Sequence, residues 1–119
     1  MKKWIAAGVP IDGVGAQTHL SAGQASRVPD ALAAVCAAAP ECAITELDIA
    51  GSNANEYATV AQACLQTANC VGITVWGVRD SDSWRASTQP LIFDNSYNAK
   101  AAYTQMVAKA TAAAKSKTA

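Results

Sequence analysis

Residues 71–78 (Val-Gly-Ile-Thr-Val-Trp-Gly-Val) are apolar almost throughout. Such a run is typical of a strand buried on both faces, as in a parallel sheet covered by helices. Two strand-like segments precede it, with Ala-rich helical patterns between the strands. The expected strands are residues 11–18, 42–49 and 71–78. The expected helices are residues 24–39, 53–67 (capped by Asn53) and 98–114, the last after a loop over 79–97 rich in Ser, Asp and Pro. This order predicts an α/β fold.

The strand–helix units repeat one another, because a cysteine stands near each helix end and another at the start of the next strand. Such internal repetition is typical of a (β/α) barrel. A closed barrel, however, takes eight strands and about 250 residues. An open sheet of three strands would expose two edges. We therefore expect residues 1–119 to form one undivided part of a larger barrel domain.

The composition excludes several classes of function. Hydrophobic residues make up 51% of the chain and charged residues 15%, which argues against disorder. Nine basic and nine acidic residues cancel, and no basic run indicates a nucleic-acid partner. No apolar run approaches the roughly 20 residues that span a bilayer, so no membrane partner is expected. The apolar stretch after Lys3 is broken by Gly8 and Pro10, and we interpret it as a helix end and a turn rather than a signal peptide.

The four cysteines form two pairs, Cys36 with Cys42 and Cys64 with Cys70, and five residues separate the members of each pair. This spacing is wider than the roughly two-to-four-residue gaps of zinc sites, and His19 is the only histidine. Two short disulfides in an exported protein are the favoured interpretation. Four buried free thiols, or a small redox or metal protein, remain alternatives. No metal and no cofactor are expected.

The expected strand over 42–49 carries two carboxylates, Glu46 and Asp48. Side chains alternate along a regular strand, so these two acids would share one face with Ile44. The opposite face would then hold Ala43, Thr45, Leu47 and Ile49. Two acids on one face of an apolar strand are costly unless that face is polar, paired or catalytic. The strand is therefore where we expect the chemistry of the protein.

Six blocks of sequence together carry a family resemblance: residues 8–20, 44–49, 70–78, 82–85, 90–94 and 97–103. With these blocks in this order, the chain resembles the C-terminal portion of glycoside hydrolase family 10 endo-1,4-β-xylanases, especially the fungal ones, over about residues 2–109. The resemblance implies a partial (β/α)8 TIM barrel, approximately strands six to eight with their helices. It also implies a secreted enzyme that cleaves β-1,4-xylan with retention of configuration.

The resemblance assigns catalytic roles to three residues. Glu46 matches the nucleophile, and Asp48 matches the aspartate that hydrogen-bonds a histidine, here His19. A retaining glycosidase needs a pair of carboxyl groups roughly 5 to 5.5 Å apart. Glu46 and Asp48 are not expected to be that pair, because both project from one strand and cannot flank a bond from opposite sides. Without the resemblance, His19 would be interpreted as a structural histidine.

The resemblance also implies substrate-binding residues. Gln17, like His19, matches a residue that lines the sugar-binding cleft. Trp76 and Trp84 match aromatics that flank the bound sugar, and Arg85 lies on the same loop and is assigned to substrate binding. Tryptophan faces suit the C–H surfaces of sugars, although the pattern alone would place Trp76 in the core. Trp4, Tyr57 and Tyr103 lie on helical stripes and are expected to pack.

The chain departs from the family pattern in one large respect. The general acid/base glutamate of the family lies in a Trp-Asp-Val-Val-Asn-Glu type motif on strand four, and no such motif occurs among these residues. The chain alone is therefore expected to be inactive or nearly so. The expected partners are xylan or xylo-oligosaccharide, and a complementary N-terminal barrel fragment or a second copy. A non-catalytic carbohydrate-binding remnant that uses Gln17, Trp76 and Trp84 is the alternative.

Overall fold

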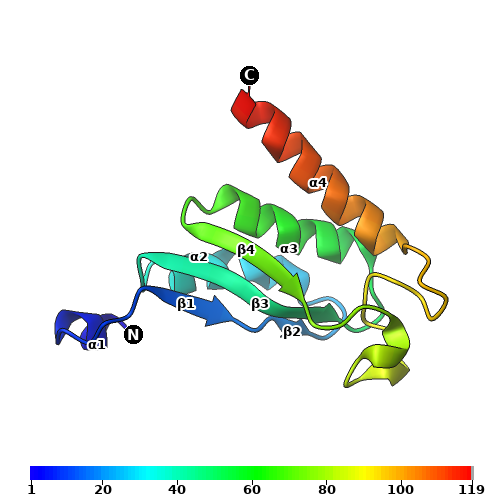
Figure 1. The fold of residues 1–119 in the computed structure, drawn as a ribbon, viewed down its shortest axis with the longest axis horizontal. Helices are drawn as coiled ribbons and strands as arrows, with labels where there is room; N and C mark the ends of the chain where they lie inside the picture. The colour runs from blue at the N-terminus through cyan, green and yellow to red at the C-terminus, as the bar shows by residue number, and fades with distance from the viewer. Residues whose placement is uncertain (119) are drawn as a thin grey trace.

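The computed structural model describes residues 1–118 and contains one open parallel sheet with helices against one face (Figure 1). The strands are β1 (Gly13–Ala16), β2 (His19–Leu20), β3 (Glu41–Ile49) and β4 (Cys70–Val75). The α-helices are α1 (Lys2–Ala6), α2 (Val28–Cys36), α3 (Ala54–Gln66) and α4 (Ala101–Thr118), with short 3-10 turns at Ala25–Arg27, Asp80–Asp82 and Ala86–Thr88. Helices α2 and α3 lie behind the sheet in Figure 1, and α4 packs against α3. None of the described helices is long and apolar enough to cross a lipid bilayer.

The predicted elements are present with shifted ends. The helix expected over 24–39 becomes a 3-10 turn followed by α2, where Pro29 occupies the first turn and its missing N–H costs no hydrogen bond. Asn53 caps α3 as predicted, because its side chain accepts hydrogen bonds from two backbone N–H groups of the first turn. Strand β4 ends at Val75, since Gly77 follows with a φ of 129° that breaks the extended backbone.

The first expected strand, residues 11–18, is divided into β1 and β2. Thr18 has a φ of 69°, a left-handed conformation that no regular strand can contain. Its hydroxyl donates to the carbonyl of Ala16 at 3.1 Å, which stabilises this local turn. Beyond it, β2 lies beside β3 (Figure 1). The register of this pairing places His19 opposite Asp48. The turn at Thr18 therefore sets the register that brings the histidine to the acids.

Strand β3 contains a register shift that changes which residues face the core. Ile44 pairs with Ile73, whereas Leu47 pairs with Val75, so β3 has an extra residue between these pairs. The expectation of strict alternation, with Ile44 beside the acids, is therefore wrong. Ile44, Leu47 and Ile49 are 1%, 0% and 0% exposed and belong to one buried cluster. The carboxylates of Glu46 and Asp48 instead contact His19 of β2.

The core lies between the sheet and helices α2 and α3. Its largest buried side chains are Tyr57, Ile44, Leu47, Ile49, Leu91 and Val60. The Tyr57 hydroxyl donates to the carbonyl of Pro90, and burial raises the pKa of this phenol. Tyr103 packs against Phe93, with ring centroids 5.1 Å apart. The packing expected of Trp4 is wrong, because its side chain is 60% exposed on α1, a helix without buried residues.

Both predicted disulfides are present, and each joins the end of a helix to the next strand. Cys36 is bonded to Cys42, which ties α2 to β3, and Cys64 is bonded to Cys70, which ties α3 to β4. Among the described residues no cysteine is free. The alternatives of four free thiols, or of a thiol-based redox or metal protein, are therefore wrong.

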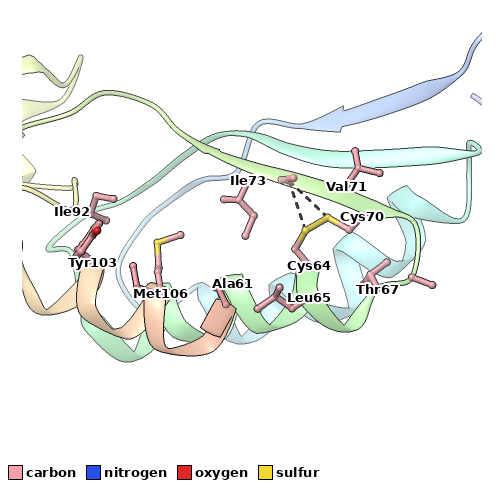
Figure 2. A pocket seen from close by; sticks show the side chains of 14 residues that line it. Ala61, Cys64, Leu65, Thr67, Cys70, Val71, Ile73, Ile92, Tyr103 and Met106 are labelled. Carbon is pink, nitrogen blue, oxygen red and sulfur yellow. Dashed lines mark hydrogen bonds between the residues drawn. A yellow bond between two sulfur atoms is a disulfide. The ribbon is translucent and has the colours of Figure 1, made fainter. Parts of the chain in front are cut away.

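An apolar groove follows each open edge of the sheet. The larger groove, about 790 Å³, lies between β4 and helices α3 and α4, and its walls include Leu65, Ile73 and Met106 (Figure 2). The smaller groove, about 170 Å³, lies between the β1–β2 edge and α2, and its walls include Leu20 and Leu32. Within residues 1–118, β3 is the only strand paired with β1, β2 and β4. Among these residues, no further strand pairs with either outer edge of the sheet, and apolar side chains are accessible beside both edges.

Removal of one disulfide tests how strongly these short covalent ties stabilise the open sheet. Replacing both Cys64 and Cys70 with alanine should lower the free energy of unfolding by about 2 kcal/mol, because the unfolded chain loses a loop constraint. Urea denaturation followed by circular dichroism measures the change. The matched control is the Cys36–Cys42 pair, which has the same sequence separation of 6 and should give a similar loss. An unchanged midpoint in both variants would contradict the expectation.

Candidate active site

Three side chains meet where β2 and β3 end. The register of these parallel strands places His19 directly opposite Asp48. The Nδ1 atom of His19 lies 2.9 Å from Asp48 Oδ2, and its Nε2 atom lies 2.9 Å from Glu46 Oε2. The imidazole therefore bridges the two carboxylates and fixes the direction of both.

Both ring nitrogens of His19 face carboxylate oxygens at hydrogen-bond distance. Glu46, His19 and Asp48 therefore form one cluster of hydrogen-bonding side chains.

Asp48 is the fully buried member of the cluster, with 0% exposure. Its Oδ2 atom also accepts a hydrogen bond from Trp84 Nε1 at 2.8 Å, and its Oδ1 atom accepts one from Arg85 Nη2. A buried carboxylate is tolerated only when donors or cations surround it. His19 on β2 and Trp84 and Arg85 on the loop after β4 surround the Asp48 carboxylate with donors. They also leave Asp48 no free oxygen with which to attack a substrate.

Glu46 is placed differently, because its side chain is 26% exposed. His19 holds Oε2, while within residues 1–118 the other oxygen, Oε1, has no hydrogen-bond partner. The backbone N–H of Glu46 donates to the carbonyl of Gln17 at 3.0 Å. Glu46 thus combines a fixed orientation with an accessible oxygen, which is the arrangement a nucleophilic carboxylate needs.

Two tryptophans form an aromatic wall next to the cluster, where Trp84 contacts His19 and Asp48. Trp76 is 47% exposed and Trp84 is 66% exposed. Both line a shallow depression of about 450 Å³ that also includes Gly77 and Ser83. The Trp84 ring meets the His19 ring edge-on, with centroids 5.3 Å apart. Trp76 is therefore not a core residue, and the exposed indoles suit the apolar faces of a sugar.

The remaining predicted residues lie at the margin of the cluster. The Gln17 side chain is exposed, and its backbone carbonyl is held by Glu46. The Arg85 guanidinium points inward, because Nη2 donates to Asp48 and to the carbonyl of Leu20 at 2.7 Å. The structure therefore brings Arg85 to the support of Asp48, although the sequence assigned it to substrate binding.

One supporting ion pair was not anticipated from the sequence. The Lys100 ammonium lies 2.9 Å from Asp80 Oδ2, and Asp80 Oδ1 also accepts from the backbone N–H of Leu91 at 2.9 Å. These contacts anchor both ends of the loop that carries Trp84 and Arg85. No local pattern could have identified the pair, because its members lie on opposite sides of an irregular loop.

Comparisons with known proteins find similar sequences. A model of glycosyl hydrolase family 10 matches residues 1–109. Endo-1,4-beta-xylanase 3 of Hypocrea jecorina is 54% identical over 108 residues, which cover 90% of this chain and 31% of the relative. Endo-1,4-beta-xylanase 2 of Claviceps purpurea is 49% identical over 106 residues, which cover 89% of this chain and 33% of the relative. The chain thus spans about a third of the length of these relatives.

Solved structures show the same similarity. A thermostable mutant of a xylanase from Cellvibrio japonicus superimposes with a TM-score of 0.80 at 28% identity, covering 91% of this chain and 42% of that one. A mutant of xylanase10C from the same organism, in complex with xylopentaose, gives a TM-score of 0.77 at 27% identity and covers 91% of this chain and 29% of that one. The prediction of an incomplete (β/α)8 barrel is confirmed.

Replacing Asp48 with asparagine tests whether the buried carboxylate holds the cluster together. The change should lower the free energy of unfolding by about 3 to 5 kcal/mol, because it leaves Arg85 without its buried counter-charge. Chemical denaturation measures the loss. The matched control is Asp82→Asn, which removes a carboxylate from an exposed pair with Arg79 and should change stability little. Equal losses in the two variants would show that Asp48 has no special structural role.

Proposed function

The chain belongs to glycosyl hydrolase family 10, and we propose that it is the nucleophile-bearing part of a retaining endo-1,4-β-xylanase. The single observation that supports this most is the cluster of Glu46, His19 and Asp48 beside two exposed tryptophans. The curated relatives of the chain are endo-1,4-β-xylanases. We extend their activity to the whole protein of which this chain would form a part.

In the proposed mechanism, Glu46 attacks the anomeric carbon of the xylose unit on one side of the scissile bond. The attack forms a covalent glycosyl-enzyme intermediate as the leaving sugar oxygen takes a proton from a general acid. Water, activated by the same acid/base group, then releases the sugar with its configuration retained. The accessible Oε1 atom of Glu46 is the attacking atom, since His19 holds Oε2.

His19 and Asp48 serve as positioning groups in this mechanism. A carboxylate that rotates freely would meet the anomeric carbon in many orientations, and orientation contributes strongly to enzyme rates. The imidazole, held by Asp48 on one side, restricts the rotation of Glu46 on the other. Asp48 does not act as the general acid here, because it is buried and its oxygens are occupied.

We assign the general acid/base to polypeptide beyond these residues. The retaining reaction needs a second carboxyl group about 5 to 5.5 Å from the nucleophile. In support, the chain spans about a third of its relatives, which leaves most of their length to supply that group. General acid help alone contributes about 10²–10⁴-fold to such reactions. Residues 1–119 by themselves are therefore expected to be inactive or nearly so.

The proposed substrate is xylan or a xylo-oligosaccharide, bound against the faces of Trp76 and Trp84 with help from Gln17. The depression between the tryptophans is shallow and open, as a wall of a cleft for a polymer would be. Similar solved xylanases are complexes with xylopentaose and xylohexaose. Disulfides persist in oxidising compartments, and the two observed here fit our proposal of an extracellular enzyme.

The partner we propose is the remainder of the barrel, bound along both open edges of the sheet. In this chain, β1 and β2 occupy one strand position beside β3, and β4 occupies the other. Closing an eight-stranded barrel then requires about five more strands. A second copy would contribute too few, so a complementary segment is the better occupant. Its helices would cover the apolar groove beside β4 (Figure 2) and the smaller one beside β1.

Reconstitution tests this proposal directly. The purified chain should release almost no reducing sugar from xylan, because the acid/base is missing. Addition of a polypeptide that carries the rest of the barrel of the Hypocrea jecorina relative should restore hydrolysis. Glu46→Gln should then reduce the restored rate by at least about 10³-fold, as expected for loss of a nucleophile.

Three outcomes would count against parts of the proposal. Hydrolysis by the chain alone that disappears in Glu46→Gln would mean that the site is complete without a partner. Restored hydrolysis that survives Glu46→Gln would remove the nucleophile from Glu46. Binding of xylohexaose by calorimetry, unchanged in Glu46→Gln and without hydrolysis in any mixture, would favour a carbohydrate-binding protein that uses the exposed tryptophans.

A further inference from the structure

We propose that Arg85 is a positioning residue for the nucleophile, acting through Asp48 and His19, rather than a residue that contacts the sugar. The inference rests on the proposed function of Glu46, because positioning matters only if that carboxylate attacks. Its basis is the inward orientation of the guanidinium, which contacts the two strands that carry the cluster.

The guanidinium joins the ends of β2 and β3. Its Nη2 atom donates to the carbonyl of Leu20 at 2.7 Å, to the carbonyl of Asp48 at 3.0 Å and to Asp48 Oδ1. Strand β2 consists of His19 and Leu20 only, so few backbone hydrogen bonds hold the histidine in register. A cation that binds both strand ends compensates for this short pairing.

Arg85 also fixes the plane of the Asp48 carboxylate. With Oδ1 held by the guanidinium, Oδ2 is directed to His19 Nδ1 at 2.9 Å and to Trp84 Nε1 at 2.8 Å. Without this contact, the carboxylate could rotate and lose one of the two donors. The imidazole would then lose its anchor, and Glu46 would lose the group that fixes its own orientation.

One unfavourable feature of Arg85 supports a specific role for this side chain. Arg85 Nε is buried, and within residues 1–118 it has no hydrogen-bond partner. An unsatisfied buried N–H is unfavourable, so a side chain chosen only for packing would avoid it. The Arg85 side chain is 18% exposed and lies over the Trp84 ring at 5.5 Å. The bonds of Nη2 are all made to the protein, and the 66% exposed indole of Trp84 is left to meet the substrate.

The four groups therefore form one relay of contacts from Arg85 through Asp48 and His19 to Glu46. Each group is hydrogen-bonded to the next, so each restricts the orientation of its neighbours. Arginine suits the first position because it stays charged at all working pH values and carries several donors. Removing that charge should weaken the hydrogen bond between Asp48 and the histidine.

Nuclear magnetic resonance of the histidine ring tests the relay without substrate. His19 is the only histidine of the chain, so ¹⁵N-labelled histidine reports on this ring alone. In the unaltered 119-residue chain, the Nδ1 proton should exchange slowly with water. In Arg85→Met it should exchange about tenfold faster or more, or be lost, because a charge-assisted hydrogen bond is weakened. Arg85→Lys should stay closer to the unaltered chain, since lysine keeps a charged donor.

The comparisons among variants separate positioning from packing. Arg79→Met removes an exposed arginine of the same loop and should leave the histidine signals unchanged. Identical Nδ1 exchange in Arg85→Met and the unaltered chain would overturn the proposal, as would equal effects of methionine and lysine, whose stems are similar. An unaltered chain without a protected Nδ1 proton would overturn it as well.

Folding of each variant is checked by circular dichroism. If Arg85→Met does not fold, Arg85→Gln replaces it and is judged by the same signal. If both neutral variants unfold while Arg85→Lys folds, the arginine serves stability alone and the proposal is wrong. Because the measurement needs no xylan and no partner, failure of the reconstitution experiment would count against the proposed function and leave this result unaffected.

Discussion

The buried charge of Asp48 is the constraint on which the rest of the site depends. A carboxylate with 0% exposure must be surrounded by donors, and here they come from separate segments, His19 on β2 and Trp84 and Arg85 on the loop after β4. Strand β2 is only two residues long, and the loop after β4 contains no strand or α-helix. Their common acceptor holds these segments together, so one buried charge organises His19, Trp84 and Arg85.

The same site could not be assembled on a flat, regular sheet. The left-handed Thr18 ends β1 and restarts pairing at β2, and the extra residue in β3 rotates the acids away from Ile44 and the core. Strand irregularities of this kind are common beside active sites because they redirect individual side chains. The disulfides, which tie α2 to β3 and α3 to β4, hold the layers together while these strands depart from regular geometry.

The sheet is covered on one face and open at both edges. Helices α2 and α3 cover one face of the sheet (Figure 1). Apolar grooves accompany both edges, one beside β4 (Figure 2) and one beside β1. Edges of parallel sheets are rarely left unpaired in finished domains. This openness is consistent with our proposal that the chain supplies one wall of a cleft, with the nucleophile, while other polypeptide supplies the opposite wall.

The sequence by itself determined the alternation of strands and helices, the Asn53 cap and both disulfide pairs, because each of these follows from local periodicity or short spacing. It did not anticipate the division of the first strand into β1 and β2. It also singled out Glu46, Asp48 and His19, since acids on an apolar strand are conspicuous and the blocks around them resemble a known family. Only the tertiary structure decided that Trp76 is exposed, that Arg85 turns inward and that Asp80 pairs with Lys100. These features depend on contacts between segments distant in the chain, and on a register shift that strict alternation cannot anticipate, so no local pattern carries them.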